Sequence, residues 1–166
     1  MRTRAASAAD AATIQELYRA TPGYFDVISI PVPTVDEVRT DLATATGDPR
    51  RHVEIVLIEP ERVGEAATID PVTGEAAVGY LDYKLDYPEE GDATVNLMLV
   101  RGDMQSRGIG RACALDLEER LKGRSRRMLA SIYGENPRAR AFWESLGYRF
   151  AIDARPLLEW YAKRLA

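Results

Sequence analysis

Apolar side chains recur every three or four residues in four stretches of the chain, which is the spacing of one helix face. These stretches are residues 10–18, 34–42, 109–121 and 136–146. Asp10 is placed to cap the first helix, and Thr34 and Glu37 have the spacing of a capping box at the start of the second. Asn136 followed by Pro137 is likewise a favourable helix start.

A period of two, which is typical of strands, appears in the middle of the chain and near its end. Strands are predicted at residues 53–58, 77–86, 94–100, 128–133 and 148–152. In the second of these, Asp82 and Lys84 would line a solvated face. The first three follow one another through short connections, so an antiparallel meander is expected. Residues 157–165 fit a helix or a strand, and residues 21–33, rich in Pro and aromatic residues, are expected to form a loop or lid.

The order of elements is helices, then the meander, then strand–helix–strand–helix–strand, which predicts an α+β or mixed α/β fold. A length of 166 residues predicts one domain spanning residues 1–166. The net charge of −4 disfavours general nucleic-acid binding. Apolar runs are far shorter than the ~20 residues that cross a bilayer, and the N-terminus lacks the apolar segment of a signal peptide. A cytoplasmic protein without membrane contact is therefore expected.

The chain has one cysteine, Cys113, and one histidine, His52. One cysteine excludes an intrachain disulfide and any zinc site with two or more thiolates, so no metal is predicted. Cys113 falls on the apolar stripe of the helix at 109–121 and is expected to be a small core residue. A thiol–imidazole pair acting as a nucleophile is therefore not expected.

The segment most informative about chemistry joins a strand to a helix N-terminus. It reads Gln105-Ser-Arg-Gly-Ile-Gly-Arg111. Free backbone N–H groups and the helix dipole meet there, and Gly108 and Gly110 let an anion approach the backbone closely. Arg107 and Arg111 add positive charge. A pyrophosphate is the expected ligand.

Neither common nucleotide-binding loop matches this segment. A Walker A loop requires a lysine after its last glycine, and a Rossmann loop requires a third glycine where this chain has Cys113. On the loop alone, a helix N-terminus with two permissive glycines and no ligand stays open as an alternative.

A second segment, Asn136-Pro-Arg-Ala-Arg-Ala-Phe-Trp-Glu-Ser-Leu-Gly-Tyr148, favours a ligand. Together, Gln-x-x-Gly-x-Gly and Asn-x-x-Ala-x-x-Phe-aromatic-x-x-x-Gly-Tyr resemble the two central motifs of the GNAT superfamily of N-acetyltransferases. The motifs cover about residues 94–150, and the order of elements fits that fold from end to end. The resemblance implies a mostly antiparallel central sheet flanked by helices, with acetyl-CoA as co-substrate.

In that family, the strand ending at Val100 splays from the next strand, and the pantetheine arm of acetyl-CoA pairs with its free edge. The resemblance places Met98, Leu99 and Val100 on this edge, with the Leu99 amide as the oxyanion-hole donor to the thioester carbonyl. It also implies a hydrogen bond from Asn136 to the pantetheine arm. The loop implied to bind the cofactor comprises Gln105, Ser106, Arg107, Gly108, Ile109, Gly110 and Arg111.

Two positions depart from the acid and base that family members use. Trp143 stands where many have a tyrosine acid, and Ser131 stands where some have a glutamate base. Indole is no proton donor at useful pH, so Tyr133, on the same strand face as Ser131, is the expected acid, with simple packing as the alternative. The base stays open between Asp82, Glu89, Glu90 and a chain of water molecules.

The main expectation is an N-acetyltransferase that transfers an acetyl group from acetyl-CoA to an amine, on a small molecule or a peptide, by direct attack in a ternary complex. Tyr24, Phe25 and Trp143 are expected to shape the acceptor pocket. One alternative is a non-catalytic acetyl-CoA-binding module on the same fold. Another is a nucleotide-binding protein that uses Gly108 and Gly110. Dimers are common in the family, so a homodimer is allowed.

Overall fold

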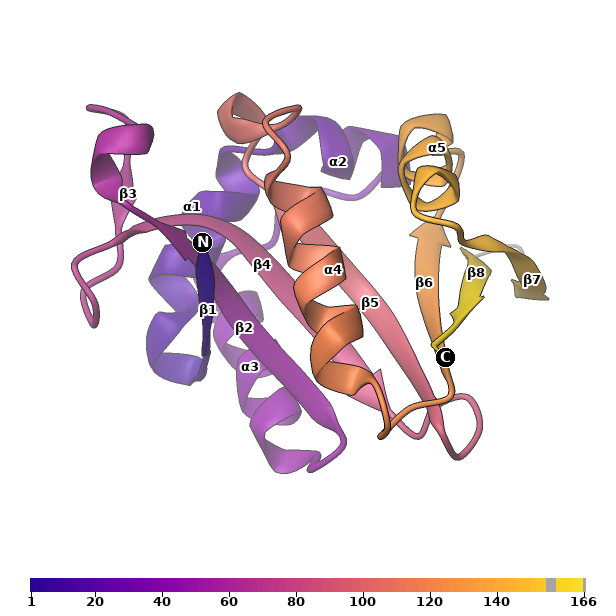
Figure 1. The fold of residues 1–166 in the computed structure, drawn as a ribbon. Coiled ribbons are helices and arrows are strands. Elements are labelled where there is room, and N and C mark those ends of the chain that lie inside the picture. Colours follow the sequence, from indigo (N-terminus) through magenta and orange to yellow (C-terminus); the bar gives the residue numbers. More distant parts are fainter. Residues whose placement is uncertain (155–157, 166) are drawn as a thin grey trace.

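The computed structural model describes residues 1–154 and 158–165. Its strands are β1 (Arg2–Ala5), β2 (Arg51–Ile58), β3 (Thr68–Ile69), β4 (Ala76–Leu85), β5 (Asp92–Val100), β6 (Arg127–Tyr133), β7 (Arg149–Ala154) and β8 (Leu158–Arg164). Its α-helices are α1 (Ala11–Arg19), α2 (Pro22–Ile28), α3 (Val35–Gly47), α4 (Ile109–Leu121) and α5 (Pro137–Ser145). The strands form one sheet in the order β1-β2-β4-β5-β6-β8-β7, with β3 paired to β4 (Figure 1). The predicted mixed α/β fold is confirmed.

The sheet separates two layers of helices (Figure 1). On one side, α4 and α5 cover a core that includes Val56, Ile58 and Leu117. On the other side, α1 and α3 cover a core that includes Ile14 and Ile55. Adjacent β2 residues thus face opposite layers, as the alternation of a strand requires. The central strands are therefore buried on both faces.

The four helices predicted from periodicity all form, and two of them begin with the expected caps. The Glu37 amide donates to Thr34 Oγ1 at 3.2 Å, and the Thr34 amide donates back to Glu37 Oε1 at 3.3 Å. At the start of α5, the Ala139 amide donates to Asn136 Oδ1 at 3.0 Å. These contacts lie within four residues of each other in sequence, which is why the sequence predicts them.

The N-terminal segment differs from its prediction in two ways. Residues Arg2–Ala5 form the edge strand β1 on β2, although their sequence shows no apolar alternation. Asp10, expected to cap α1, instead accepts a hydrogen bond from the Ser7 amide at 2.9 Å and pairs with Arg4 at 2.6 Å. A 3₁₀ turn precedes α1, so the Asp10 carboxylate points back toward β1 and not into the helix.

The meander β2–β4–β5 is antiparallel, as predicted. The expected solvated face of β4 is wrong, because the helical layer of α1 and α3 covers it and leaves Asp82 only 6% exposed. Arg51 of β2 donates to both Asp82 carboxylate oxygens, at 3.1 and 2.6 Å. The buried carboxylate is therefore paired, as the cost of burying a lone charge demands.

Two segments for which the sequence predicts no definite helix or strand adopt regular structure. Within residues 21–33, Pro22–Ile28 form α2 with Pro22 in the first turn, so the expected loop is wrong for this part. The final segment is the strand β8, because it pairs with β6 on one side and β7 on the other. Leu157, the first residue of that prediction, lies outside the described residues.

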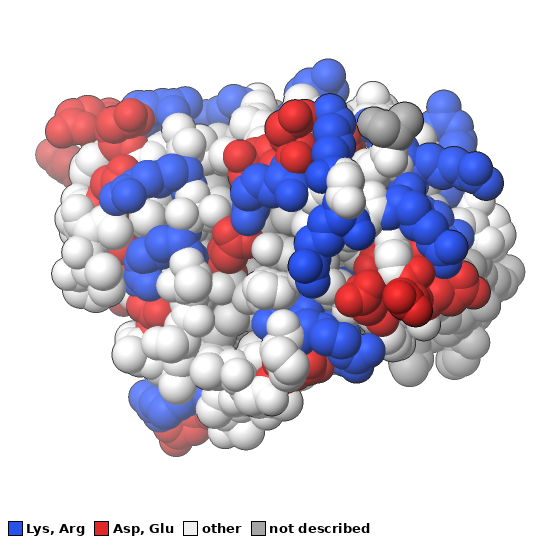
Figure 2. Space-filling model, turned by 60° about the horizontal axis from the view of Figure 1, so that its bottom comes forward, with Lys and Arg blue, Asp and Glu red and all other residues white. Residues whose placement is uncertain are grey.

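None of the described helices is long and apolar enough to cross a bilayer. Basic and acidic side chains are mixed over the face shown in Figure 2. Two arginines at the start of β6 pair with carboxylates: Arg127 donates to both oxygens of Asp92, and Arg126 lies 3.2 Å from Glu89. On this face, these arginine charges are balanced by neighbouring carboxylates.

Candidate active site

The two central strands of the sheet separate toward one end. β5 and β6 are parallel, and their pairing ends where Val95 meets Ala130. β5 continues to Val100 on β4, and β6 continues to Tyr133 on β8. A register shift against β4 leaves Asn96 as an extra residue, a β-bulge, at the point where β5 and β6 part. The opening between them is called the wedge below.

Alternate residues of β5 present their backbone to the wedge. Leu99 pairs with Tyr80, and a Cβ on Gly79 would lie 2.6 Å from the Leu99 carbonyl oxygen, so the Leu99 backbone faces β4. Backbone N–H and C=O groups alternate in direction along a strand, so those of Met98 and Val100 face the wedge. The role implied for the Leu99 amide is corrected: this amide belongs to the β4 ladder.

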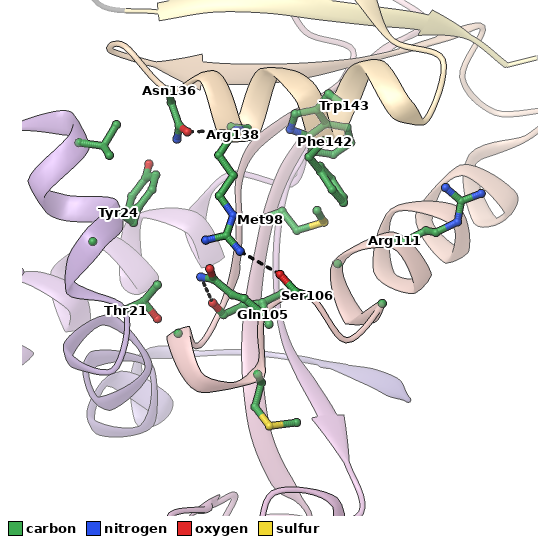
Figure 3. A pocket seen from close by; sticks show the side chains of 18 of the residues that line it. Thr21, Tyr24, Met98, Gln105, Ser106, Arg111, Asn136, Arg138, Phe142 and Trp143 are labelled. Atoms are coloured by element: carbon green, nitrogen blue, oxygen red, sulfur yellow. Dashed lines mark hydrogen bonds between the residues drawn. The ribbon is translucent and has the colours of Figure 1, made fainter.

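A cavity of about 710 Å³ opens beside the wedge, between α2 and α5 (Figure 3). The predicted site residues that line it are Tyr24, Met98, Val100, Gln105, Ser106, Gly108, Gly110, Arg111, Asn136 and Trp143. The predicted residues Phe25, Leu99, Arg107, Ile109 and Tyr133 are not in its lining. Ile109 and Phe25 are core residues, at 3% and 4% exposure. The structure thus brings most of the predicted cofactor residues to one cavity.

The start of α4 has the backbone geometry of an anion site. Gly108 is its N-cap with φ +83°, and Ser106, two residues earlier, also has a positive φ of 61°. The first amides of a helix have no intrahelical acceptor and point toward its N-terminus. A Cβ on Gly110 would touch the Phe142 ring at 3.5 Å and the Val100 side chain at 3.7 Å. Gly110 therefore has room for a Cβ in ordinary van der Waals contact with two residues that line the cavity.

Positive charge at the cavity comes from two helices. Arg111 lies in the first turn of α4. Arg138 of α5 reaches across the cavity, and its Nη2 donates to Ser106 Oγ at 3.3 Å (Figure 3). Arg138 is not among the predicted site residues, although it stands in the Asn-Pro-Arg start of the second motif. Its approach to the loop depends on how α4 and α5 pack.

Gln105 connects the loop of residues 105–111 to the end of β5 through a hydrogen bond. Its Nε2 donates to the Val100 carbonyl oxygen at 2.9 Å.

On the opposite wall, Trp143 is 5% exposed and packs against Tyr148 with ring centroids 4.8 Å apart. Trp143 therefore lines the cavity as part of the core below α5. Tyr24 lines it from α2, and burial raises the pKa of its phenol to about 12.

Tyr133 is half-buried at the open end of β6. Burial raises the pKa of its phenol, and the nearby Asp82 carboxylate raises it further, so the phenol stays protonated at neutral pH. Both carboxylate oxygens of Asp82 accept hydrogen bonds from Arg51. Glu89 and Glu90 lie in the turn before β5, at the other end of the strand from the wedge.

Cys113 and His52 lie away from the cavity lining. Cys113 is 1% exposed on α4, and burial raises the pKa of its thiol to about 12. The His52 ring, on β2, stacks on Tyr83 at a centroid distance of 5.1 Å. Over residues 1–154 and 158–165, no group of three or more His, Cys, Asp or Glu side chains is arranged to hold a metal ion.

The family model that matches this chain is described as the Acetyltransferase (GNAT) family, and the match spans residues 36–148. This stretch holds the wedge, the loop and the whole of α5. The chain belongs to this family. None of the curated proteins compared with the chain matches it. Membership in the GNAT family confirms the prediction of an acetyltransferase with acetyl-CoA as its co-substrate.

Solved structures agree with this assignment. An acetyltransferase from Thermus thermophilus is 36% identical, with 99% of this chain and 96% of that chain covered and a TM-score of 0.84. The spermidine N-acetyltransferase from Vibrio cholerae, solved with CoA and spermine, is 13% identical (99% and 95% covered, TM-score 0.72). The PaiA N-acetyltransferase from Thermoplasma acidophilum, solved with coenzyme A, is 11% identical (98% and 98% covered, TM-score 0.69). These last two share the fold.

Proposed function

We propose that this GNAT protein acetylates an amine by direct transfer from acetyl-CoA, with both substrates bound at once. The observation that carries the proposal is the wedge, which starts where Val95 and Ala130 end the pairing of β5 with β6. It adjoins the cavity, which residues of α2, α4 and α5 line, and its strand β5 contributes side chains to both cores. A thioester in the wedge can therefore be reached by an amine from the other side of the sheet.

The donor fits the cavity by its chemistry. The pantetheine arm carries amides, which can pair with the backbone groups of Met98 and Val100 as an added strand does. The pyrophosphate suits the N-terminus of α4, where backbone amides and the helix dipole favour an anion. Arg111 and Arg138 line the same cavity and supply positive charge there. Asn136 lines the same cavity and is placed to contact the pantetheine arm.

Direct transfer is favoured over an acetyl-enzyme. The thiolate is the nucleophilic form of cysteine, and a buried Cys113 with a pKa of about 12 stays a thiol at neutral pH. The chain has one cysteine and one histidine, and neither lines the cavity. The amine itself is then the attacking group.

The reaction has two proton problems. An alkylammonium with a pKa of ~10.4 is neutral in only about one molecule in 10³ at pH 7, so its proton must be lost before attack. The leaving CoA thiolate, with a thiol pKa of ~8.5, needs a proton less urgently. Tyr133 holds its proton at neutral pH and lies at the wedge, so we assign it as the donor to sulphur. Water removes the ammonium proton, since Asp82 is held by Arg51.

The acceptor is an amine of a small molecule or a peptide. Tyr24 of α2 lines the cavity next to the wedge and is placed to contact it. The spermine in the Vibrio cholerae neighbour supports an amine acceptor on this fold. Steady-state release of CoA, measured over a panel of amines and peptides, tests the proposal. Tight acetyl-CoA binding without turnover on any of them would favour the non-catalytic module instead.

A further inference from the structure

Ser106 and Arg138 belong to the two segments that follow the parted strands of the wedge. Ser106 lies in the loop after β5, and Arg138 lies in the first turn of α5, after β6. Both residues line the cavity, and Arg138 Nη2 donates a hydrogen bond to Ser106 Oγ at 3.3 Å (Figure 3). This contact therefore joins the two sides of the wedge through a pair of cavity-lining side chains.

The guanidinium of Arg138 is engaged differently from that of its neighbour on α5. Arg140 forms an ion pair with Glu159 at 3.3 Å. Within residues 1–154 and 158–165, Arg138 has no carboxylate partner, and the Ser106 hydroxyl is its hydrogen-bond acceptor. A hydroxyl carries no net charge, and a guanidinium has several N–H donors. The charge of Arg138 and most of its donors therefore stay available to an anion in the cavity.

The loop that holds Ser106 leads directly into the start of α4. Gly108, two residues after Ser106, is the N-cap of α4, where the first backbone amides point out of the helix. The Ser106 hydroxyl thus brings the Arg138 guanidinium to the loop whose amides suit a pyrophosphate. An anion at this point would meet main-chain donors of the loop and the side chain of an arginine from α5.

An arginine side chain must lose rotamer freedom before it can bind a ligand in one geometry. A contact that already holds the side chain in the free protein lowers this cost on binding, which is the principle of preorganisation. Ser106 and Arg138 are both exposed, so water competes for their hydrogen bond and the benefit is modest. The contact is therefore suited to orient Arg138 while leaving it free to adjust to a ligand.

We propose that Ser106 is a positioning residue, which holds the Arg138 guanidinium over the start of α4 to bind the pyrophosphate of acetyl-CoA. The proposal rests on the proposed function, in which the start of α4 binds this pyrophosphate. The pyrophosphate then lies between backbone amides from the β5 side of the wedge and a guanidinium from the β6 side. Ser106 contributes to affinity through Arg138 and makes no contact of its own with the phosphates.

Substitutions at Ser106 separate the effect of its hydroxyl from that of its backbone conformation. Ser106 has a φ of 61°, which glycine adopts without strain and asparagine tolerates. Calorimetry with acetyl-CoA should show a loss of about fivefold for both Ser106→Ala and Ser106→Gly, the size expected for ordering one long side chain on binding. Ser106→Asn restores a side-chain oxygen as acceptor and should stay near the wild type. Wild-type affinity in Ser106→Gly would overturn the proposal.

Ser145→Ala is the matched control for these variants. Ser145 also lines the cavity, but its hydroxyl donates to the Phe142 carbonyl oxygen at 2.6 Å, within α5. Loss of this hydroxyl should leave acetyl-CoA affinity near the wild-type value, and circular dichroism checks that each variant is folded. An equal loss in Ser145→Ala would show that any change in the cavity wall weakens binding, and it would overturn the specific role of Ser106.

A double-mutant cycle separates positioning from direct contact. A serine hydroxyl has a hydrogen of its own, which a phosphate oxygen could accept. If Ser106 acts through Arg138, Ser106→Ala should cause no further loss of acetyl-CoA affinity in an Arg138→Ala background. A loss of the same size in that background would contradict the proposal, because Ser106 would then act on the ligand or on the loop independently of Arg138.

A donor without phosphates tests the site of action. S-acetylpantetheine carries the thioester and the pantetheine arm of acetyl-CoA but no pyrophosphate. With an accepted amine, the ratio of kcat/KM for acetyl-CoA to kcat/KM for S-acetylpantetheine should fall about fivefold in Ser106→Ala. Equal losses with both donors would indicate a structural effect and would overturn the proposal. Failure of the proposed function would instead appear as no turnover by the wild type on any amine, with the pattern of acetyl-CoA affinities intact.

Discussion

The two sides of the wedge are built in different ways. On the side of α4 and α5, the site consists mainly of backbone: the Met98 and Val100 edge of β5 and the first amides of α4 after Gly108. On the side of α2, the cavity is lined by side chains such as that of Tyr24, and Tyr133 lies at the open end of β6. A donor shared by a whole family can be recognised by main chain, whereas an acceptor particular to one enzyme needs side chains.

The electrostatics of the two sides differ in the same way. The donor side combines a helix N-terminus with Arg111 and Arg138, all of which favour a polyanion. On the other side, Asp82 and Arg51 pair with each other, and Arg51 also pairs with Asp41 at 2.9 Å. These charges pair with one another within the protein, whereas the charges on the donor side suit a polyanionic ligand.

The largest effect is expected from Gly108→Glu, which places a carboxylate at the pyrophosphate position. Acetyl-CoA binding should weaken by at least about 100-fold, because opposing like charges cost several kcal/mol. Gly108→Asn is the matched control, since asparagine tolerates the φ of +83° without adding charge. Calorimetry measures both, and circular dichroism checks the fold. Wild-type affinity in Gly108→Glu would place the cofactor elsewhere.

Tyr133→Phe should lower kcat by about 100-fold, the lower end for general acid catalysis, and change the KM for acetyl-CoA far less. A raised phenol pKa means that the proton is present at neutral pH and is lost only above pH 10, the ordinary value. The wild-type kcat should therefore fall at high pH, and this fall in the pH–rate profile should be absent in Tyr133→Phe. Stopped-flow pH–rate profiles measure it. Wild-type kinetics in the variant would remove Tyr133 from the reaction.

Arg138→Ala should weaken acetyl-CoA binding about tenfold, which is the effect of one hydrogen bond to a charged group. Arg107→Ala is the matched comparison, because Arg107 belongs to the loop that Arg138 contacts at Ser106 but does not line the cavity. Its affinity should stay near the wild-type value. Titration at two salt concentrations measures both, and the loss in Arg138→Ala should shrink at high salt. The reverse ranking of the two arginines would contradict the arrangement in Figure 3.

Tyr24→Phe should have the smallest effect and should fall on the acceptor side alone. We expect the acceptor KM to rise about threefold, within the range for one hydrogen bond, with acetyl-CoA affinity unchanged. Phe25→Leu is the contrast, because Phe25 is 4% exposed in the core and its loss should lower the melting temperature without changing KM. Steady-state kinetics and thermal melts separate the two. An equal change in donor affinity for Tyr24→Phe would show that the sides of the wedge are not separable.

Features set by neighbours in sequence could be predicted. Thr34 with Glu37, and Asn136 with Ala139, form their caps within one helical turn. The loop up to Gly110 and the start of α5 are short motifs, and both reach the cavity. Local hydrogen bonds and glycine conformations depend on a few adjacent residues, so the sequence alone indicates them.

Features set by packing could not be predicted. Asp82 has the alternation of a solvated strand, but the layer of α1 and α3 buries it beside Arg51. Arg138 approaches Ser106 only because α5 packs beside the start of α4. Edge strand β1 has no apolar pattern and is defined by its pairing with β2. In each case the deciding partner is distant in sequence.

The sequence by itself determined the family, the acetyl donor and the cofactor loop, because these depend on contiguous motifs. Only the tertiary structure decided which backbone groups face the donor, since register and direction along β5 are set by its pairing with β4. A change of one residue in a strand reverses the side to which a group points, and this excludes the Leu99 amide in favour of Met98 and Val100. The tertiary structure also brought Trp160 of β8 to Ser131 of β6, where the indole Nε1 donates to Ser131 Oγ at 2.9 Å, because cross-strand neighbours are defined by pairing and not by spacing along the chain.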